Sequence, residues 1–290
     1  MTAQKPLPAA LDRDEVLTLI RLALDEDLRY GPDVTSVATV PADAVAKASV
    51  GARSAGTIAG IDVGLLVLDE VIGAGNYEVL DRVADGTRVE AGQSVLSVMA
   101  PTLGLLTAER TMLNLVCHLS GIATATSQWV DAVAGTHAKI RDTRKTLPGL
   151  RSLQKYAVQV GGGFNHRMGL GDAALIKDNH VAAAGSVVAA LRAVRELAPN
   201  IECEVEVDNL TQLDEVLAEN VELILLDNFP LWQTQIAVQR RNTVSPSTKL
   251  EASGGLSLDV AAEYAGTGVD YLAVGGLTHS VTVLDLGLDM

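Results

Sequence analysis

The first part of the chain begins with a helix-like spacing of apolar residues. Residues 12–28 carry Val16, Ile20 and Leu24 at the spacing of one helix face, and Asp12 precedes them where an N-cap belongs. The pattern predicts an amphipathic helix over this segment, packed on a core by its apolar face.

Beyond the break at Gly31-Pro32 the pattern becomes strand-like. Residues 46–60 and 76–101 alternate apolar and polar positions and are interrupted by glycines, which predicts short strands joined by turns. Residues 105–135 return to helical spacing and predict one or two long helices.

From residue 137 onward, strand-like and helix-like runs alternate regularly. This alternation is typical of parallel βα units, in either an α/β barrel or a doubly wound sheet. The last residues of nearly every run are charged, polar or glycine, and a barrel gathers such residues from many strands whereas an open sheet binds at one crevice. We therefore favour a barrel, incomplete or closed by another element because fewer than eight strands are evident. The strand-like runs are residues 138–144, 174–179, 202–209, 221–228, 249–255 and 269–276.

Composition and charge narrow the class of protein. The chain has 290 residues, 48% of them hydrophobic, and a net charge of −14, which suits a globular protein and argues against general nucleic-acid binding. Cys117 and Cys203 are too few for a disulfide framework and are expected to be packing residues. Neither a signal peptide nor an uninterrupted apolar run is evident, so we expect a cytoplasmic protein that does not bind membranes.

Positive charge is concentrated in one segment of this acidic chain. Residues 139–177 contain eight basic and two acidic side chains, a net +6, while the rest of the chain carries −20. Arg151 and Lys155 fit a solvated helix face. Several of the others follow apolar strands where a barrel opens, and converging cations indicate a polyanionic ligand such as a dicarboxylate or phosphate. These are Arg144, Lys145 and Lys177, with His166 and Arg167 nearby.

Carboxylates and glycines follow on the later strands. Glu206 and Asp227 end two successive runs, where they could hold Mg2+ or accept hydrogen bonds from sugar hydroxyls. By alternation, Glu204 points the same way as Glu206 but deeper in the barrel. The last two runs end in glycines that could bring backbone N–H groups close to a phosphate. These residues are Ser253, Gly254, Gly255, Gly275 and Gly276, followed by His279.

At this point the residues resemble a known family. The similarity spans nearly the whole chain and is to quinolinate phosphoribosyltransferases, also called carboxylating nicotinate-nucleotide pyrophosphorylases. One departure is Pro32, which stands between Gly31 and Asp33 where the family usually reads Gly-Asp, and we expect it to change only a surface turn. The matching segments are TAERTMLN (107–114), SGIAT (120–124), DTRKTLPGLR (142–151), residues 155–180, EVEVDN (204–209), LLDNF (225–229), EASGG (251–255) and AVGGLTHS (273–280).

The resemblance implies a type II phosphoribosyltransferase fold. An N-terminal open α/β sandwich is expected over residues 1–115, with residues 280–290 as a candidate addition. An incomplete α/β barrel is expected over residues 116–279. The family works as a homodimer, and the resemblance implies that Arg110 reaches into the neighbouring site.

The resemblance also implies roles for the site residues. Arg144, His166, Arg167 and Lys177 would bind the two carboxylates of quinolinate, and Lys145 could serve both substrates. Glu206 and Asp227 would handle Mg2+ and the ribose hydroxyls of phosphoribosyl pyrophosphate. Phosphate would be held by Ser253, Gly254, Gly255, Gly275 and Gly276, with His279 nearby.

The implied reaction joins the ring nitrogen of quinolinate to ribose C1, releases pyrophosphate, and removes the ring 2-carboxylate as CO2 to give nicotinate mononucleotide. No covalent nucleophile is evident, so positioning and electrostatics would carry catalysis. Either Lys145 or Lys177 could steady the ring carbanion left by CO2.

Three alternatives stay open at this point. The first is a phosphoribosyltransferase for nicotinate or another base, which would need fewer cations. The second is a barrel aldolase with Lys177 as a Schiff-base amine. The third is a carrier or regulatory protein built on the lipoyl-like residues 85–98, although the lysine that such a carrier modifies is absent from the turn.

Overall fold

The computed structural model describes residues 7–290 and divides by internal contacts into two compact units. Unit 1 contains residues 1–127, 147–162 and 280–290, and unit 2 contains residues 128–146 and 163–279. The N-terminal six residues of unit 1 lie outside the described part. The predicted domain limits, 1–115 and 116–279, stay a prediction beside this division by contacts.

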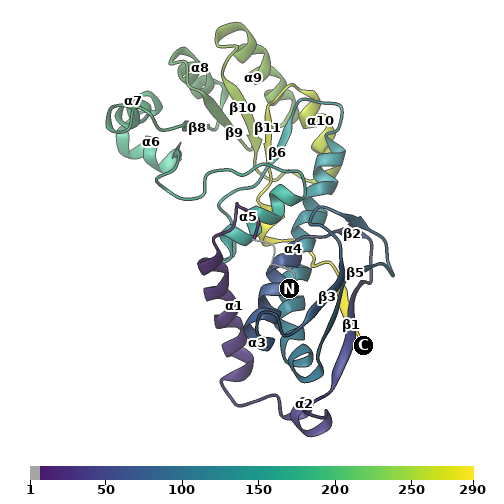
Figure 1. Ribbon diagram of the computed structural model, residues 1–290. Coiled ribbons are helices and arrows are strands. Elements are labelled where there is room, and N and C mark those ends of the chain that lie inside the picture. The colour runs from purple at the N-terminus through teal and green to yellow at the C-terminus, as the bar shows by residue number, and fades with distance from the viewer. Residues whose placement is uncertain (1–6) are drawn as a thin grey trace. The chain divides into compact units, whose positions relative to one another are not determined.

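Unit 1 is an antiparallel sheet with helices against one face (Figure 1). The predicted helix over 12–28 is confirmed as α1, where the Asp12 carboxylate accepts hydrogen bonds from the backbone N–H groups of Asp14 and Glu15. The long helical pattern forms one helix, α4. The four-stranded sheet has the order β12-β1-β5-β3, and β2 pairs with β4. The elements are α1 Arg13–Leu28, α2 Val34–Thr39, β1 Val45–Ala52, β2 Gly56–Thr57, α3 Ile61–Ile72, β3 Glu78–Arg82, β4 Arg88–Val89, β5 Ser94–Pro101, α4 Thr102–Ala132, α5 Arg151–Val160 and β12 Leu286–Asp289.

Helix α5 follows the first strand of unit 2 in sequence but belongs to unit 1. The Tyr156 hydroxyl at its centre donates to the Asp85 carboxylate at 2.6 Å. The same carboxylate accepts from the backbone N–H groups of Gly60 and Ile61 at the start of α3. Lys155 of α5 is fully buried, so its predicted place on a solvated helix face is wrong. The two basic residues of α5, Arg151 and Lys155, did not reveal this, because burial there is set by the tertiary position of the helix.

Unit 2 is a six-stranded parallel sheet whose order β6-β11-β10-β9-β8-β7 follows the chain except at one place. The last strand, β11, pairs with the first, β6, so β6 and β7 are the two edge strands and no pairing between them closes the sheet. The incomplete barrel predicted from the sequence is confirmed. Its elements are β6 Lys139–Arg141, β7 Ala174–Ile176, α6 Asp178–Ala184, α7 Val187–Leu197, β8 Cys203–Val207, α8 Leu210–Ala218, β9 Leu223–Asp227, α9 Leu231–Val244, β10 Lys249–Ser253, the short 3-10 turn η1 Leu258–Val260, α10 Ala261–Gly266, β11 Tyr271–Ala273 and α11 Gly276–His279.

The gap between β6 and β7 has a local cause. In a regular βα barrel the helix after a strand covers the junction with the next strand, but α5 packs in unit 1 instead. The segment after α5 partly replaces the missing pairing, because Phe164 forms a parallel bridge with Arg141 and its N–H donates to the Ile140 carbonyl at 2.8 Å. Residues 163–173 therefore lie along the open edge of the barrel.

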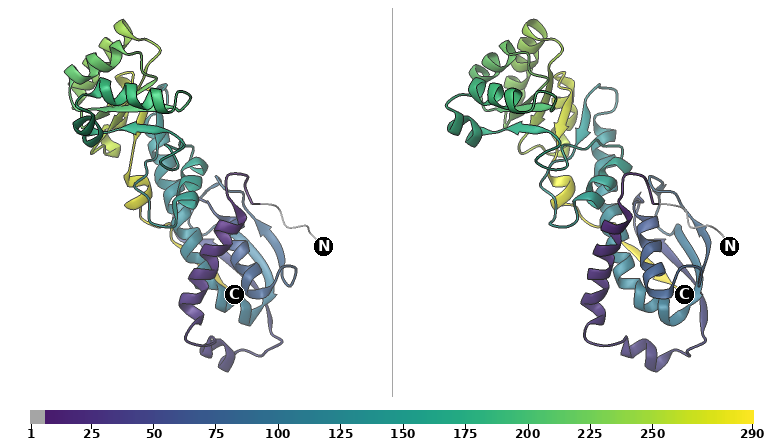
Figure 2. Two further views of the ribbon diagram at one scale, coloured as in Figure 1. Left: turned by 90° about the vertical axis from the view of Figure 1, so that its left-hand side faces the viewer. Right: turned by 60° about the vertical axis from the view of Figure 1, so that its left-hand side comes forward.

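The two faces of the parallel sheet differ in polarity. Residues alternate between the faces along each strand, and the outer set, which includes Val205, Ile224 and Leu250, is apolar and buried. Helices lie on that outer side (Figure 2). The strand register then places the alternate residues, Glu204 and Glu251 among them, on the inner face. Burial of the apolar outer face thus fixes which polar side chains point into the barrel.

Beneath the strands, Arg241 ties helix α9 to the starts of β10 and β11. Its guanidinium donates to the Thr248 carbonyl at 2.8 Å, to the Gly268 carbonyl at 2.9 Å and to the Asp270 carboxylate at 2.8 Å. The side chain is buried, so these bonds form away from water. The ion pair between Arg241 and Asp270 lies at the amino ends of the strands, opposite the carboxyl ends where the polar residues gather.

Some elements were not predicted from the sequence. Helix α3 lies between the two predicted strand-like segments, where no element was predicted, and α6 immediately after β7 was not anticipated. Cys203 is buried, as expected for a packing residue, while Cys117 is half-buried. None of the described helices is both long enough and apolar enough to cross a membrane.

Candidate active site

The carboxyl ends of three neighbouring strands bring predicted site residues to one edge of unit 2. Glu206 lies near the end of β8, Asp227 ends β9 and Ser253 ends β10, and the register pairs Asp227 directly with Ser253. Strand β9 ends here because the following residue, Asn228, turns away from the sheet with a φ of 53°. The Asn228 amide donates to Asp227 at 2.7 Å and its backbone N–H to the Ser253 carbonyl at 2.9 Å.

Lys177 is held at both ends beside this edge. Its ammonium lies 2.7 Å from the Glu206 carboxylate, and its backbone N–H donates to the Nδ1 atom of His180 at 2.9 Å. His180 stands in the first turn of α6, so the start of that helix fixes where Lys177 leaves the strand. The sequence analysis assigned no role to His180, and its spacing of three residues from Lys177 was the available signal.

Glycine is required at Gly254. Its φ is +94°, and a Cβ atom there would collide with Asn228. Gly255 also has a positive φ, of 60°, and is exposed with open space around its Cα. The two glycines therefore leave backbone accessible at the end of β10, as the phosphate prediction needs.

A second group gathers at the ends of β6 and β11. A Cβ atom on Gly275 would lie 3.1 Å from the Lys145 side chain and 3.4 Å from the Nε2 atom of His279. The Thr278 hydroxyl donates to the Lys145 carbonyl at 2.9 Å. Lys145, Gly275 and His279 are thus neighbours, with Gly276 beginning α11 between the last two.

The guanidinium groups of Arg144 and Arg167 repel each other, although the carboxylates of Asp172 and Glu204 also act on Arg167 and oppose this effect. Burial and the charge of Arg144 together lower the pKa of Arg167. The Nε atoms of both arginines are buried without a hydrogen-bond partner, and Arg167 donates from Nη1 to the Ala173 carbonyl at 3.1 Å. Like charges this close indicate a place where an anion would be stabilised.

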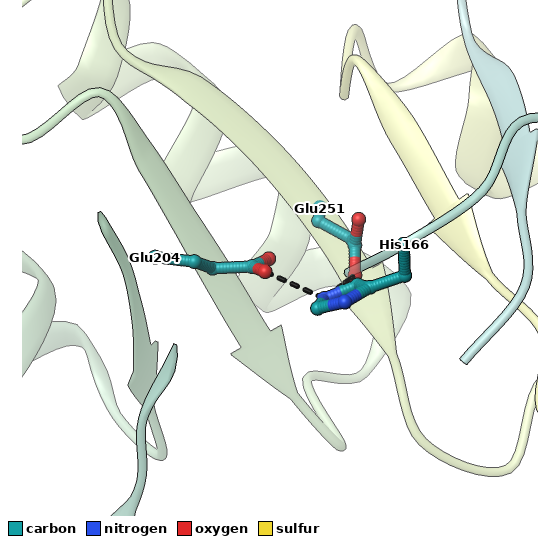
Figure 3. Close-up of side chains that lie close together, drawn as sticks. All are labelled: His166, Glu204 and Glu251. Carbon is teal, nitrogen blue, oxygen red and sulfur yellow. Dashed lines mark ion pairs between the residues drawn. The ribbon is translucent and has the colours of Figure 1, made fainter. Parts of the chain in front are cut away.

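The barrel interior holds a buried cluster below this edge (Figure 3). His166 lies between Glu204 of β8 and Glu251 of β10, with its Nε2 atom 2.6 Å from Glu204 and 3.8 Å from Glu251. Arg141 of β6 donates to the other oxygen of Glu251 at 2.6 Å. Burial raises the pKa of each glutamate to about 7, and the charge of Arg141 opposes the rise in both.

Sequence reasoning found part of this cluster. The alternation placed Glu204 deeper than Glu206, and the structure agrees, since Glu204 is 3% exposed. Glu251 was missed, although it stands two residues before Ser253 just as Glu204 stands two residues before Glu206. A charged residue two positions inside an apolar strand end was the available signal.

Two sets of side chains could be considered for a metal ion. His166, Glu204 and Glu251 offer ligand atoms that lie within 4.8 Å of one another. Arg141 already forms an ion pair with Glu251, and the charge of Arg167 acts on Glu204. These two positive charges oppose the binding of a dication there. Glu206 and Asp227 offer hard carboxylate oxygens at adjacent strand ends, where Mg2+ usually also takes phosphate oxygens and water.

Arg110 is not among the residues that unit 2 brings together. It lies exposed on α4 in unit 1. A cavity of about 540 Å3 in unit 2, lined by Ile176, His180 and Val194, includes only one of the predicted residues, Arg167. The polar strand edge itself is therefore the candidate site, and this cavity is not.

The fold and this edge define a phosphoribosyltransferase with a parallel catalytic sheet. The model of the quinolinate phosphoribosyl transferase N-terminal domain matches residues 33–120, and that of the C-terminal domain matches residues 122–289. The chain belongs to the quinolinate phosphoribosyl transferase family, and the function and enzyme class predicted from the sequence, a pentosyltransferase of NAD biosynthesis, are confirmed.

Individual relatives agree over nearly the whole chain. The nicotinate-nucleotide pyrophosphorylase [carboxylating] of Mycobacterium leprae is 70% identical over 96% of this chain and 98% of its own. The solved nicotinate-nucleotide pyrophosphorylase of Francisella tularensis has a TM-score of 0.90 and 36% identity, covering 96% of this chain and 97% of its own. NadC from Streptococcus pyogenes has a TM-score of 0.90 and 37% identity, covering 97% of each chain.

The raised pKa of Glu251 gives this buried cluster a measurable pH dependence. The folded pKa of about 7 lies above the ordinary value of 4.5, so the folded state holds the proton more tightly. The resulting stabilisation is present below the ordinary value and is lost as the pH rises through about 7. The groups that face Glu251 are Arg141, Glu204 and His166.

We expect Glu251→Gln to flatten the fall in the free energy of unfolding between about pH 5 and 7, by at most about 1.4 kcal/mol per pH unit. Urea unfolding at a series of pH values measures the slope. Glu78→Gln, an exposed substitution in β3, is the control. Equal slopes in wild type and Glu251→Gln would contradict the expectation.

Proposed function

We propose that the two substrates meet at the carboxyl edge of the unit 2 sheet, with quinolinate beside Arg144, Arg167 and Lys177. The observation that carries this is the repulsion between the Arg144 and Arg167 guanidinium groups, whose buried Nε atoms have no hydrogen-bond partner. A dicarboxylate would supply the missing charges through charge-assisted hydrogen bonds. His166, the fourth residue predicted to bind quinolinate, is buried, and its ring accepts a hydrogen bond from the backbone N–H of Arg167.

Phosphoribosyl pyrophosphate would lie over the neighbouring strand ends. Ser253, Gly254 and Gly255 on one side would offer a hydroxyl and backbone N–H groups to its phosphates. The group around Gly275 and Gly276 would do so on the other side, with Lys145 and His279 adding charge. The support is the exposed backbone at Gly255 and the close approach of Lys145 and His279 to Gly275.

Mg2+ is part of this proposal, with Glu206 and Asp227 as its protein ligands. Both are acidic, lie at adjacent strand ends and are only partly exposed, which suits a hard cation. When bound, the metal would neutralise charge on the pyrophosphate group. Lys177, paired with Glu206 at 2.7 Å, links this carboxylate to the quinolinate side of the edge.

The chain's own residues would act mainly by positioning. The cations fix quinolinate so that its ring nitrogen faces ribose C1, and the glycine segments hold the sugar phosphate in line. Glu206 and Asp227 place negative charge near the ribose, which favours the positive charge that develops there as the bond to pyrophosphate breaks. No covalent intermediate with the protein is required.

The homodimer is likewise a proposal, in which Arg110 of one chain completes the site of its partner. It is supported by the exposure of Arg110 on α4 and by the absence of Arg110 from the unit that holds the other site residues. The cytoplasmic location predicted from the sequence stays a prediction.

The alternatives differ from this proposal in specific ways. A Schiff-base lysine needs a desolvated amine, whereas the Lys177 side chain is 45% exposed and paired with Glu206. A carrier role for residues 85–98 falls away with the family assignment. Human nicotinic acid phosphoribosyltransferase matches with a TM-score of 0.60 at 13% identity, which shows a shared fold alone.

The substrate itself is tested by product release. With quinolinate, phosphoribosyl pyrophosphate and Mg2+, we expect equal amounts of pyrophosphate and CO2, because transfer and decarboxylation are coupled. Nicotinate should give at least about tenfold lower kcat/KM, since it leaves one cation group unpaired. Equal turnover of both acids without CO2 would favour the nicotinate enzyme.

The lysine that assists decarboxylation can be identified from the ratio of decarboxylated to undecarboxylated nucleotide that a variant releases. We expect Lys145→Ala or Lys177→Ala to release the nucleotide that still carries both carboxylates, because an ammonium group no longer stabilises the ring carbanion. Mass spectrometry of the products measures the ratio of the two nucleotides. Lys47→Ala, exposed on β1, is the control, and unchanged ratios in both site variants would remove the idea.

Sharing of Arg110 is tested by complementation. Arg110→Ala and Lys177→Ala should each form almost no nicotinate mononucleotide, while their mixture should regain roughly a quarter of the wild-type rate of its formation through random exchange of subunits in a twofold dimer. A mixture that stays inactive after subunit exchange has been verified would place Arg110 outside the partner's site.

A further inference from the structure

We infer that Glu204 and Glu251 are positioning residues, which hold the imidazole of His166 inside the barrel so that it sets the backbone and guanidinium of Arg167 at the site edge. This rests on the proposed function in one respect, namely that Arg167 contacts the carboxylate of the substrate. In this arrangement His166 acts through Arg167 and does not itself contact quinolinate.

The hydrogen bonds of the His166 ring carry the inference. The backbone N–H of Arg167 donates to Nδ1 at 2.8 Å, so Nδ1 is the acceptor. Nε2 lies 2.6 Å from a carboxylate oxygen of Glu204, so Nε2 bears the proton and donates it (Figure 3). Both ring nitrogens are therefore engaged with the protein, and the ring is 7% exposed.

The ring is the point where the 163–173 segment reaches across the barrel. On the near side, Asp142 accepts from the His166 backbone N–H at 2.7 Å and donates its own N–H to the Phe164 carbonyl at 3.0 Å. These bonds tie the segment to β6. On the opposite side of the barrel, the ring contacts Glu204 of β8 and Glu251 of β10, and these contacts fix how far the ring extends into the interior. The segment lies at the edge between β6 and β7, where strand pairing does not close the barrel.

The carboxylates are arranged to serve the ring. Glu251 uses one oxygen for Arg141, at 2.6 Å, and directs the other toward Nε2, at 3.8 Å. The latter oxygen and the second oxygen of Glu204 are buried without hydrogen-bond partners, so no other donor competes with the ring for these two oxygens. Two buried acids that serve only packing would be costly to retain.

The role predicts which substitutions are tolerated at position 204. Gln keeps an oxygen acceptor for the Nε2 proton, whereas Leu keeps the bulk and leaves that proton unsatisfied in the interior. We expect Glu204→Leu to raise the KM for quinolinate by about tenfold, as for a buried donor that loses its acceptor. Glu204→Gln should restore most of the loss, and the KM for phosphoribosyl pyrophosphate should change less than about twofold.

A matched control separates positioning from general destabilisation. Asp270 pairs with buried Arg241 at the opposite ends of the strands, so Asp270→Asn breaks a comparable pair away from the site. This variant should lower the midpoint of thermal unfolding and leave both KM values unchanged. The inference is overturned if Glu204→Leu leaves the KM for quinolinate unchanged, or if it raises both KM values to the same extent.

A spectroscopic measurement on the wild-type protein needs no variant that might fail to fold. In full-length protein labelled with 15N-histidine and assigned with His166→Gln, the His166 signals should report a protonated Nε2 and an unprotonated Nδ1 at pH 7. A doubly protonated ring would overturn the inference. Wild-type protein that fails to turn over quinolinate would refute the proposed function, while the ring measurement would still decide the state of His166.

Discussion

The ion pair between Arg141 and Glu251 is the interaction on which the interior of unit 2 depends. A parallel sheet with an apolar outer face must turn its alternate residues inward, and here several of those residues are charged. A buried carboxylate is stable only when it is paired or protonated, because desolvation penalises the charged form. Arg141 supplies the pairing across the curl from β6 to β10. Glu204, His166 and the 163–173 segment can then occupy the remaining space.

That interior explains how an acidic protein can present a cationic site. The cations of the 139–177 segment do not form one surface patch. Arg141 is paired with Glu251 inside the barrel, and Lys155 is buried in unit 1. Only Arg144, Lys145 and Lys177 lie at the strand edge. Glu204, beneath the edge, favours the charged form of Arg167, and this charge and those of Arg144 and Lys145 are available to small anions.

The sequence allowed the parallel strands and most of the edge to be predicted, because both depend on local rules. Strand ends were marked by residues such as Asp227 and Ser253, and alternation alone put Glu204 below Glu206. The family roles of these residues came from the resemblance and not from spacing. Other features depend on contacts distant in sequence. The docking of α5 on Asp85, the burial of Lys155 and the pairing of Arg141 with Glu251, 110 residues away, follow from no local pattern.

The same dependence on distant contacts explains why His166 was first grouped with the direct ligands. Next to Arg167 in sequence, a histidine reads as one more cation for the substrate. In the structure, an N–H group faces one of its ring nitrogens and a carboxylate faces the other, which is the pattern of a neutral ring that transmits position. A charge on the ring would add little at an edge that already gathers Arg144, Arg167 and Lys177. What the ring contributes is a fixed position of Arg167 relative to the sheet, which the absent pairing between β6 and β7 does not provide. The buried histidine therefore compensates for the missing strand pairing. Its ring contacts to Glu204 and Glu251 hold the 163–173 segment in place where no strand pairing does so.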